Sequence, residues 1–208
     1  TVTRIEQKTS SRVQKAMKDR RRRTDDAPAE VRGSGCAPLD LARSGKAFKG
    51  GWARGLVNNI VGDGSSGKTL LALELCFWCF MFLRKVISKI YPKVKKLKII
   101  YDNGEGVMDF PVKKMYGKEF YNFVQWRRSK NFEEFCRFFL RETFALKKGE
   151  ALIYVIDSWD SFQSAKSQKA FLKSVEDDTE LKGDYDLALQ KYASRKFFPA
   201  FCDTLDNN

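Results

Sequence analysis

A glycine-rich segment of eight residues carries the clearest chemical signal in this chain. It reads GDGSSGKT and fits the pattern G-x-x-x-x-G-K-[ST], which binds the phosphates of nucleotides. Its glycines let backbone N–H groups curl around a phosphate oxygen, and the positive end of a following helix favours the same anion. We expect a phosphate-binding loop made of Gly62, Asp63, Gly64, Ser65, Ser66, Gly67, Lys68 and Thr69.

The last two residues of this loop suit a nucleoside triphosphate and its metal ion. Lys68 is expected to reach the β- and γ-phosphates, where its charge offsets theirs. The Thr69 hydroxyl is expected to take one coordination position of Mg²⁺. A strand of apolar residues, ALIYVID, ends in Asp157, and a carboxylate at the end of a buried strand is the second expected magnesium ligand.

A further carboxylate is the candidate for polarising water. The chain has no histidine, so an acidic side chain is the expected base. Glu105 follows the apolar run LKIIYD in the segment YDNGEG, and we expect it to orient water against the γ-phosphate. The alternative is a tight turn, because Asn-Gly is a strong hairpin signal.

The composition of the chain limits what it can be. Its 208 residues are 43% hydrophobic and include 17 Phe, which is enough for a packed core and excludes wholesale disorder. The formal net charge of +13 favours a polyanionic partner. Cys76 and Cys79 form a C-x-x-C inside an apolar helical run, and we expect buried free thiols rather than a metal site. Such thiols indicate a reducing, intracellular compartment.

The order of predicted elements indicates an α/β protein. Apolar runs predict strands at 56–61, 97–102, 121–126 and 151–157, and longer periodic segments predict helices at 69–91, 112–120, 131–147, 166–175 and 186–205. Strands that alternate with helices imply a mostly parallel twisted sheet with helices on both faces. The carboxyl ends of parallel strands share one edge, so we expect the loop, Glu105 and Asp157 to meet there.

The segment before the core is different in character. Residues 1–32 are expected to form a basic, flexible arm, and 33–208 the folded core. The arm contains Arg20, Arg21, Arg22 and Arg23, which either contact phosphate or a neighbouring subunit, or form a solvated tail. Residues 1–30 are polar and show no secretion signal, and the apolar run 70–83 is too short to span a bilayer. We therefore expect a cytoplasmic protein with no membrane partner.

Taken in order, these residues resemble the ATPase core of the RecA/RadA recombinase family, with phage recombinases of the UvsX type most similar. The likeness begins with GSGCAPLDLA at 33–42, continues through the approach at 50–55 and the loop GDGSSGKT, and ends with IDS at 156–158. It extends over 33–208 and implies a RecA-like P-loop NTPase fold. It also implies that Glu105 and Lys68 are catalytic and that Asp109 lies near the adenine.

The resemblance implies an ATP- and Mg²⁺-dependent protein that polymerises on single-stranded DNA and promotes strand exchange, in the nucleoid or the host-cell cytoplasm. ATP would sit between neighbouring subunits of a homo-oligomeric filament. Segment 163–186 falls where the family has its first DNA loop, and Lys166, Lys169 and Lys173 would meet DNA phosphates there. The family continues past residue 208 with a strand that senses the γ-phosphate, so the core is expected to be incomplete at its C-terminal end.

Two other functions fit the same residues. A hexameric helicase motor of the DnaB type would use this core in a ring rather than a helical filament. A non-hydrolysing, ATP-binding recombination mediator would fit if Glu105 is only a turn residue. A small-molecule kinase is disfavoured, because residues 157–186 contain no arginine for a lid.

Overall fold

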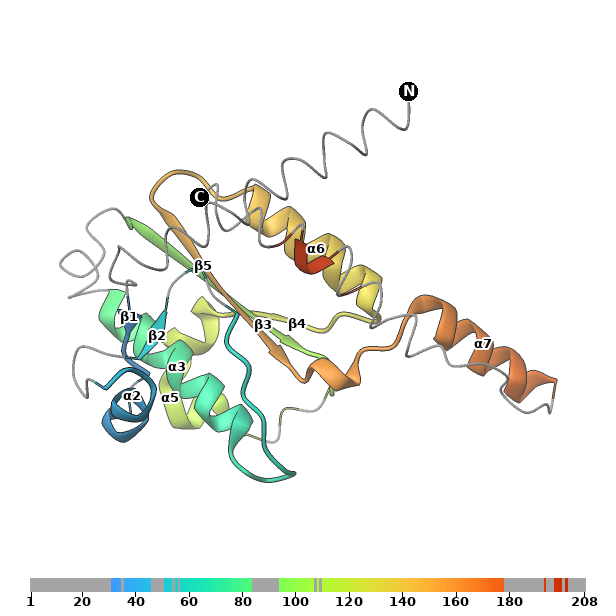
Figure 1. Cartoon of the computed structure of the whole chain (residues 1–208), viewed down its shortest axis with the longest axis horizontal. Helices are drawn as coiled ribbons and strands as arrows, with labels where there is room; N and C mark the ends of the chain where they lie inside the picture. The colour runs from blue at the N-terminus through green and yellow to red at the C-terminus, as the bar shows by residue number, and fades with distance from the viewer. Residues whose placement is uncertain are drawn as a thin grey trace. The chain divides into compact units, whose positions relative to one another are not determined.

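The computed structural model describes residues 31–34, 36–45, 51–53, 55, 57–83, 94–106, 108, 110–177, 193, 197–199 and 201 (Figure 1). These residues belong to two compact units. The first contains the described residues up to Asn59, together with 198, 199 and 201, and the second runs from Ile60 to Phe197. Asp109 and the arm residues Arg20, Arg21, Arg22 and Arg23 lie outside the described residues, as does most of the helix predicted at 186–205.

The first unit contains a two-stranded ribbon and helix α2 (Ala37–Ser44). Strand β1 (Val31–Arg32) of the ribbon pairs antiparallel with β2 (Trp52–Ala53). The buried carboxylate of Asp40, in the first turn of α2, accepts a hydrogen bond of 2.8 Å from the backbone N–H of Ser34. The helix dipole stabilises an acidic residue at this end of a helix. The hydrogen bond from Ser34 to Asp40 then holds the chain that precedes α2 against the first turn of the helix.

The second unit contains a parallel sheet with the strand order β4-β3-β5. The strands are β3 (Lys96–Asn103), β4 (Gln125–Arg127) and β5 (Glu150–Asp157), and both neighbours of β3 run parallel to it. Parallel strands need crossover connections, and helices supply them here. The predicted α/β class is confirmed at this level.

Helices cover both faces of the sheet (Figure 1). They are α3 (Lys68–Leu83) and α5 (Val112–Phe123) on one face and α6 (Phe132–Phe144) on the other, followed in the chain by the 3₁₀ turn η1 (Trp159–Ser161) and α7 (Ala165–Glu176). On the α3 side, Leu97, Ile99 and Tyr101 of β3 are buried against Leu73 and Cys76. This alternation assigns every second residue of β3 and β5 to the α3 face.

Phenylalanines form most of the core on the α6 side. The ring of Phe135 stacks on Phe162 with centroids 5.3 Å apart, and Phe139 meets Tyr154 of β5 edge-on at 5.0 Å. Aromatic rings prefer these offset and perpendicular arrangements. The helix predicted at 131–147 is therefore present as α6, and its buried side is formed largely by phenylalanines.

The two cysteines of the C-x-x-C are free and fully buried, as predicted. Burial raises the pKa of the Cys76 thiol, and the neighbouring Cys79 raises it further. Cys136 on α6 is also buried and free, and burial raises its pKa to about 12. The Cys76 and Cys136 thiols therefore remain protonated at neutral pH, and all three buried cysteines serve as small apolar side chains.

Two predicted elements differ from the structure. The strand predicted at 56–61 is wrong for its described part, 57–61, which has no strand; Asn58 and Asn59 disfavour extended pairing, and Val61 remains 85% exposed. The strand predicted at 121–126 is shorter and later, because α5 continues to Phe123. The centroid of the Phe123 ring lies 5.0 Å from that of Phe80 in α3, and this contact favours the extra helical turn.

Within the described residues, no helix combines the length and the apolar character that crossing a bilayer requires.

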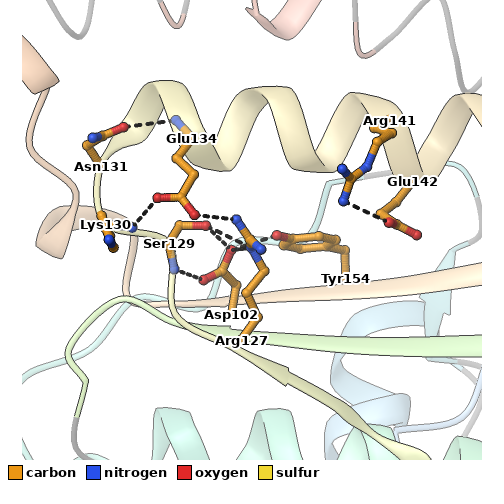
Figure 2. A network of polar contacts seen from close by, with 9 residues as sticks. All are labelled: Asp102, Arg127, Ser129, Lys130, Asn131, Glu134, Arg141, Glu142 and Tyr154. Atoms are coloured by element: carbon orange, nitrogen blue, oxygen red, sulfur yellow. Dashed lines mark hydrogen bonds and ion pairs between the residues drawn. The ribbon is translucent and has the colours of Figure 1, made fainter.

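A buried carboxylate joins β3 to β4 and β5 on the α6 face (Figure 2). Asp102 is fully buried and accepts hydrogen bonds from the backbone N–H of Ser129 (2.7 Å), the Ser129 hydroxyl (2.6 Å) and the Tyr154 hydroxyl (2.6 Å). The Nε of Arg127 lies 3.6 Å from the same carboxylate. Burial and the bond to Asp102 raise the pKa of Tyr154. A buried carboxylate needs this many donors to offset its loss of hydration.

The network continues to the start of α6 (Figure 2). Arg127 donates a hydrogen bond of 2.8 Å to Glu134, and its guanidinium lies 3.7 Å from the centroid of the Phe138 ring. The other Glu134 oxygen accepts from the backbone N–H of Lys130 at 3.1 Å, and Asn131 caps the helix by accepting from the N–H of Glu134 at 2.9 Å. One set of polar contacts therefore positions the end of β4 and the start of α6.

Replacing Asp102 with alanine should destabilise the fold strongly. The substitution leaves Arg127, Ser129 and Tyr154 without their shared acceptor, and the expected loss is about 3–5 kcal/mol of unfolding free energy. Urea denaturation followed by circular dichroism measures it. Glu176→Ala, an exposed change at the end of α7, is the control and should leave the midpoint unchanged. Equal midpoints for the two variants would contradict this role for Asp102.

Candidate phosphate-binding site

The predicted phosphate-binding loop lies directly before α3. Residues 62–67 form the turn and Lys68 is the first residue of the helix. Two residues with positive φ, Ser65 (60°) and Gly67 (86°), bend the chain back, and the N–H of Leu71 bonds to the Gly67 carbonyl at 2.9 Å to begin the helical ladder. The sequence GDGSSGKT thus forms an exposed loop that leads into the N-terminal end of a 16-residue helix.

The lysine of the loop folds back over it. Its Nζ donates hydrogen bonds to the carbonyls of Gly62 (2.8 Å) and Asp63 (2.7 Å). In the described part of the chain no carboxylate lies within ion-pair distance of Lys68, and the first turn of α3 has no acidic residue. A positive charge without a local carboxylate, at the positive end of a helix dipole, favours an anion.

The loop is tightest at its first glycine. A Cβ added to Gly62 would lie 2.6 Å from the Ser66 hydroxyl oxygen, closer than such atoms approach in proteins. Gly64, by contrast, has open space around it. A side chain at 62 would therefore force the Ser66 side chain to move, whereas one at 64 would meet no such contact.

Strand register brings the two predicted carboxylates to one edge of the sheet. β3 and β5 pair in parallel along their whole length, with Asn103 beside Asp157. Two residues beyond the end of β3, the N–H of Glu105 lies 3.4 Å from the carbonyl of Asp157. A Cβ added to Gly104 would lie 2.1 Å from the Ser161 hydroxyl oxygen, so the turn that carries Glu105 packs closely on η1. The Glu105 side chain is exposed.

Asp157 lies on the face of the sheet that α3 covers. Ile153 and Val155 pack into the core on that side, and Asp157 continues the alternation. Its Oδ2 accepts a hydrogen bond of 2.6 Å from the hydroxyl of Tyr101, which is buried in the same core. Burial raises the pKa of Tyr101, and the hydrogen bond to Asp157 raises it further. Tyr101 therefore remains a donor at neutral pH and fixes the orientation of this carboxylate.

Helix α3 begins at the end of the second unit where β3 and β5 finish (Figure 1). Its later turns contact both strands, so Lys68 and Thr69 start a helix that packs on the face carrying Asp157. Asp102 precedes Glu105 by three residues but lies on the opposite face, in the network with Tyr154, and takes no part in this site. The structure thus brings the loop, Glu105 and Asp157 to one end of the sheet.

The residues at this end could coordinate Mg²⁺ only together with the phosphates of a bound nucleotide. A hydroxyl (Thr69) and one carboxylate (Asp157) are hard oxygen donors, and Mg²⁺ commonly takes one or two such groups with phosphate oxygens and waters. Within the described ranges, no three Asp, Glu, Cys or His side chains form a cluster that could hold a metal alone. A metal here would therefore depend on the phosphates of a bound nucleotide.

The three lysines predicted to bind DNA share one side of α7. Lys166, Lys169 and Lys173 are exposed and spaced by three and four residues, which places them on one helical face. Phe171 and Val175 lie on the opposite face and Leu172 lies beside Lys169; these three side chains are 52%, 63% and 60% exposed. The N-terminal end of α7 is attached to α6, since the N–H of Ala165 bonds to Glu133 at 2.9 Å.

Sequence reasoning missed Tyr101 as part of the site. Its position in the run LKIIYD indicates only a strand residue, and its bond to Asp157 depends on the register of two strands that are 56 positions apart. The one available signal was a polar group on an otherwise apolar strand face, since a buried tyrosine hydroxyl needs a partner.

Comparison with models of known protein families gives no match, and comparison with curated proteins also gives none.

Alanine substitution at two glycines of the loop should have different effects on stability, because their backbone conformations differ. Gly67→Ala places a side chain at a φ of 86° and should cost about 1–2 kcal/mol of unfolding free energy. Gly64→Ala, the matched control in the same loop, has open space and should cost much less. Chemical denaturation of both variants measures the difference; equal losses would contradict the loop conformation described here.

Proposed function

We propose that this chain is the ATPase core of a RecA-type recombinase that hydrolyses ATP with Mg²⁺ while bound to single-stranded DNA. The proposal rests on one observation: the loop, Asp157 and Glu105 lie at the same end of the sheet. A loop closed by Lys68 leads into α3, α3 covers the sheet face that carries Asp157, and Glu105 follows the neighbouring strand at the same edge. Ligands gather at the carboxyl ends of strands in open parallel sheets.

In this proposal the phosphates of ATP replace the carbonyl groups that Lys68 now contacts. The ammonium and the backbone N–H groups of the loop hold the β- and γ-phosphates, which lowers the repulsion met by an incoming nucleophile. Thr69 and Asp157 would hold Mg²⁺, which supplies further neutralisation of phosphate charge when bound. Tyr101 keeps the Asp157 carboxylate in one orientation through its 2.6 Å hydrogen bond.

Glu105 is the group proposed to act on water. Its exposed carboxylate lies on the turn packed against η1, beside the end of β5. From there it accepts a hydrogen bond from the attacking water and takes its proton as the oxygen bonds to the γ-phosphorus. The bond from that phosphorus to the bridging oxygen breaks, and ADP leaves.

Single-stranded DNA is the proposed polyanion. The chain carries a net charge of +13, and α7 presents three lysines along one face. Helical spacing separates successive lysines by a distance that a nucleic-acid backbone can follow, and release of counterions makes such contacts sensitive to salt. Assembly of several copies into a filament along the DNA belongs to the same proposal.

Two substitutions separate nucleotide binding from hydrolysis. Lys68→Ala should abolish detectable ATP binding because it removes the charge at the phosphates. Glu105→Gln should bind ATP with unchanged affinity and hydrolyse it at least about 100-fold more slowly, since an amide does not accept the proton. Calorimetric titration with ATP and a phosphate-release assay, each with and without single-stranded DNA, provide the two measurements.

Glu119→Gln, an exposed change on α5, is the matched control and should behave as wild type. Hydrolysis that is unchanged in Glu105→Gln would remove the catalytic role and leave a nucleotide-binding protein. Full activity of Lys68→Ala would contradict the proposal.

The lysine face of α7 gives a separate test of DNA binding. Replacing Lys166, Lys169 and Lys173 with glutamine should weaken binding of a labelled dT oligomer and make the salt dependence shallower by about 2 in log–log slope, or about 0.7 for each lost phosphate contact. The charge-matched control replaces the exposed Lys118, Lys147 and Lys148 instead. Equal weakening in the two triple variants would show a general effect of net charge and no site on α7.

A further inference from the structure

A hollow of about 600 Å³ opens beside the carboxyl ends of β3 and β4. Residues from the turn after β3, from the first turns of α5 and from the end of β4 line it, and none of residues 62–69 does. Its size is typical of sites for small ligands. We call it the β4 pocket, and it is separate from the phosphate-binding loop.

Positive side chains surround the β4 pocket. Lys113 and Lys114 lie in the first turn of α5, Arg128 follows β4, and no described lining residue is acidic. Arg127 also lines the pocket but is bound to Asp102 and Glu134. The other three cations are exposed and sit close to the positive end of the α5 dipole.

These cations have few protein partners. The side chains of Lys114 and Arg128 make no hydrogen bond or ion pair with any residue that the structure describes. Arg128 lies against the backbone of Gly106, where an added Cβ would fall 2.2 Å from the guanidinium carbon. Lys113 lies 4.3 Å from the centroid of the Tyr121 ring. The pocket therefore has a concentrated charge that an anion would offset.

Aromatic side chains form an apolar wall of the same pocket. The rings of Tyr121 and Trp126 are stacked with centroids 5.2 Å apart and planes inclined by 27°. The indole N–H of Trp126 donates to the Tyr121 carbonyl at 2.8 Å, and the ring also packs 5.4 Å from Tyr101, so it is held in place from two sides. Phe110 adds a third ring to the lining.

We propose that the β4 pocket binds one nucleotide unit of a single-stranded nucleic acid. A base would pack on the Tyr121–Trp126 wall, displacing the flexible Lys113 ammonium, and its phosphate would meet Arg128 and Lys114. Aromatic walls beside cationic rims are how proteins hold single strands, because every base has a flat face and every unit has a phosphate. A duplex does not fit this chemistry, since its bases are stacked on each other.

This proposal rests on the single-stranded DNA binding proposed above and locates it, and it does not depend on ATP hydrolysis at the loop. The test therefore uses Lys68→Ala as background, so that the loop plays no part, and measures the anisotropy of a labelled dT oligomer. Adding Arg128→Gln or Lys114→Gln should weaken binding about tenfold, the usual effect of losing one charge-assisted contact. Both side chains are exposed and without described partners, so the thermal midpoint should not move. Lys118→Gln, on an exposed position of α5 outside the pocket, should bind as the background does.

A second pair of measurements tests the aromatic wall. An abasic oligomer of the same length should bind the background protein more weakly than dT, and Tyr121→Leu should bind the two equally well. The proposal is overturned if Arg128→Gln behaves like Lys118→Gln, if Tyr121→Leu still discriminates dT from the abasic strand, or if a duplex binds as tightly as the single strand. Failure of ATP binding in the protein with Lys68 intact would count against the loop alone.

Discussion

The parallel, in-register pairing of β3 with β5 is the constraint on which the rest of the second unit depends. It runs from Lys96 beside Glu150 to Asn103 beside Asp157, so both strands finish at the same level. Because side chains alternate along a strand, this one register decides which acidic residues face α3 and which face α6. A shift by one residue would move Asp157 to the other face and separate Tyr101 from it.

The two faces of this sheet carry carboxylates with different surroundings. On the α6 face, Asp102 is bound by Ser129, Tyr154 and Arg127, a set of contacts that positions strands and the start of α6. On the α3 face, the corresponding carboxylate of Asp157 has one tyrosine donor and lies at the end where α3 begins. Asp102 thus stabilises the fold, and Asp157, at the end of β5, remains available to a ligand. The same network occupies Arg127 and leaves Arg128 as the open cation of the β4 pocket.

Local sequence patterns predicted the parts of the structure that depend on local forces. Glycine and lysine spacing identified the loop, and the apolar runs before Asp102 and Asp157 identified β3 and β5. The strand expected at 56–61 did not form in its described part, because its adjacent asparagines favour loops and no described strand pairs with it. The bond from Tyr101 to Asp157 and the β4 pocket join residues from separate elements, and no single segment indicates them.

In the proposed mechanism, Asp157 and the loop residue Thr69 would hold one metal ion together with a nucleotide. Titration calorimetry of ATP with and without Mg²⁺ tests it most directly, in the wild type, in Asp157→Asn and in Thr69→Val. Mg²⁺ should increase ATP affinity in the wild type, and each substitution should remove most of this increase while leaving metal-free binding unchanged. An increase of the same size in Asp157→Asn, or the absence of ATP binding in the wild type, would contradict this mechanism.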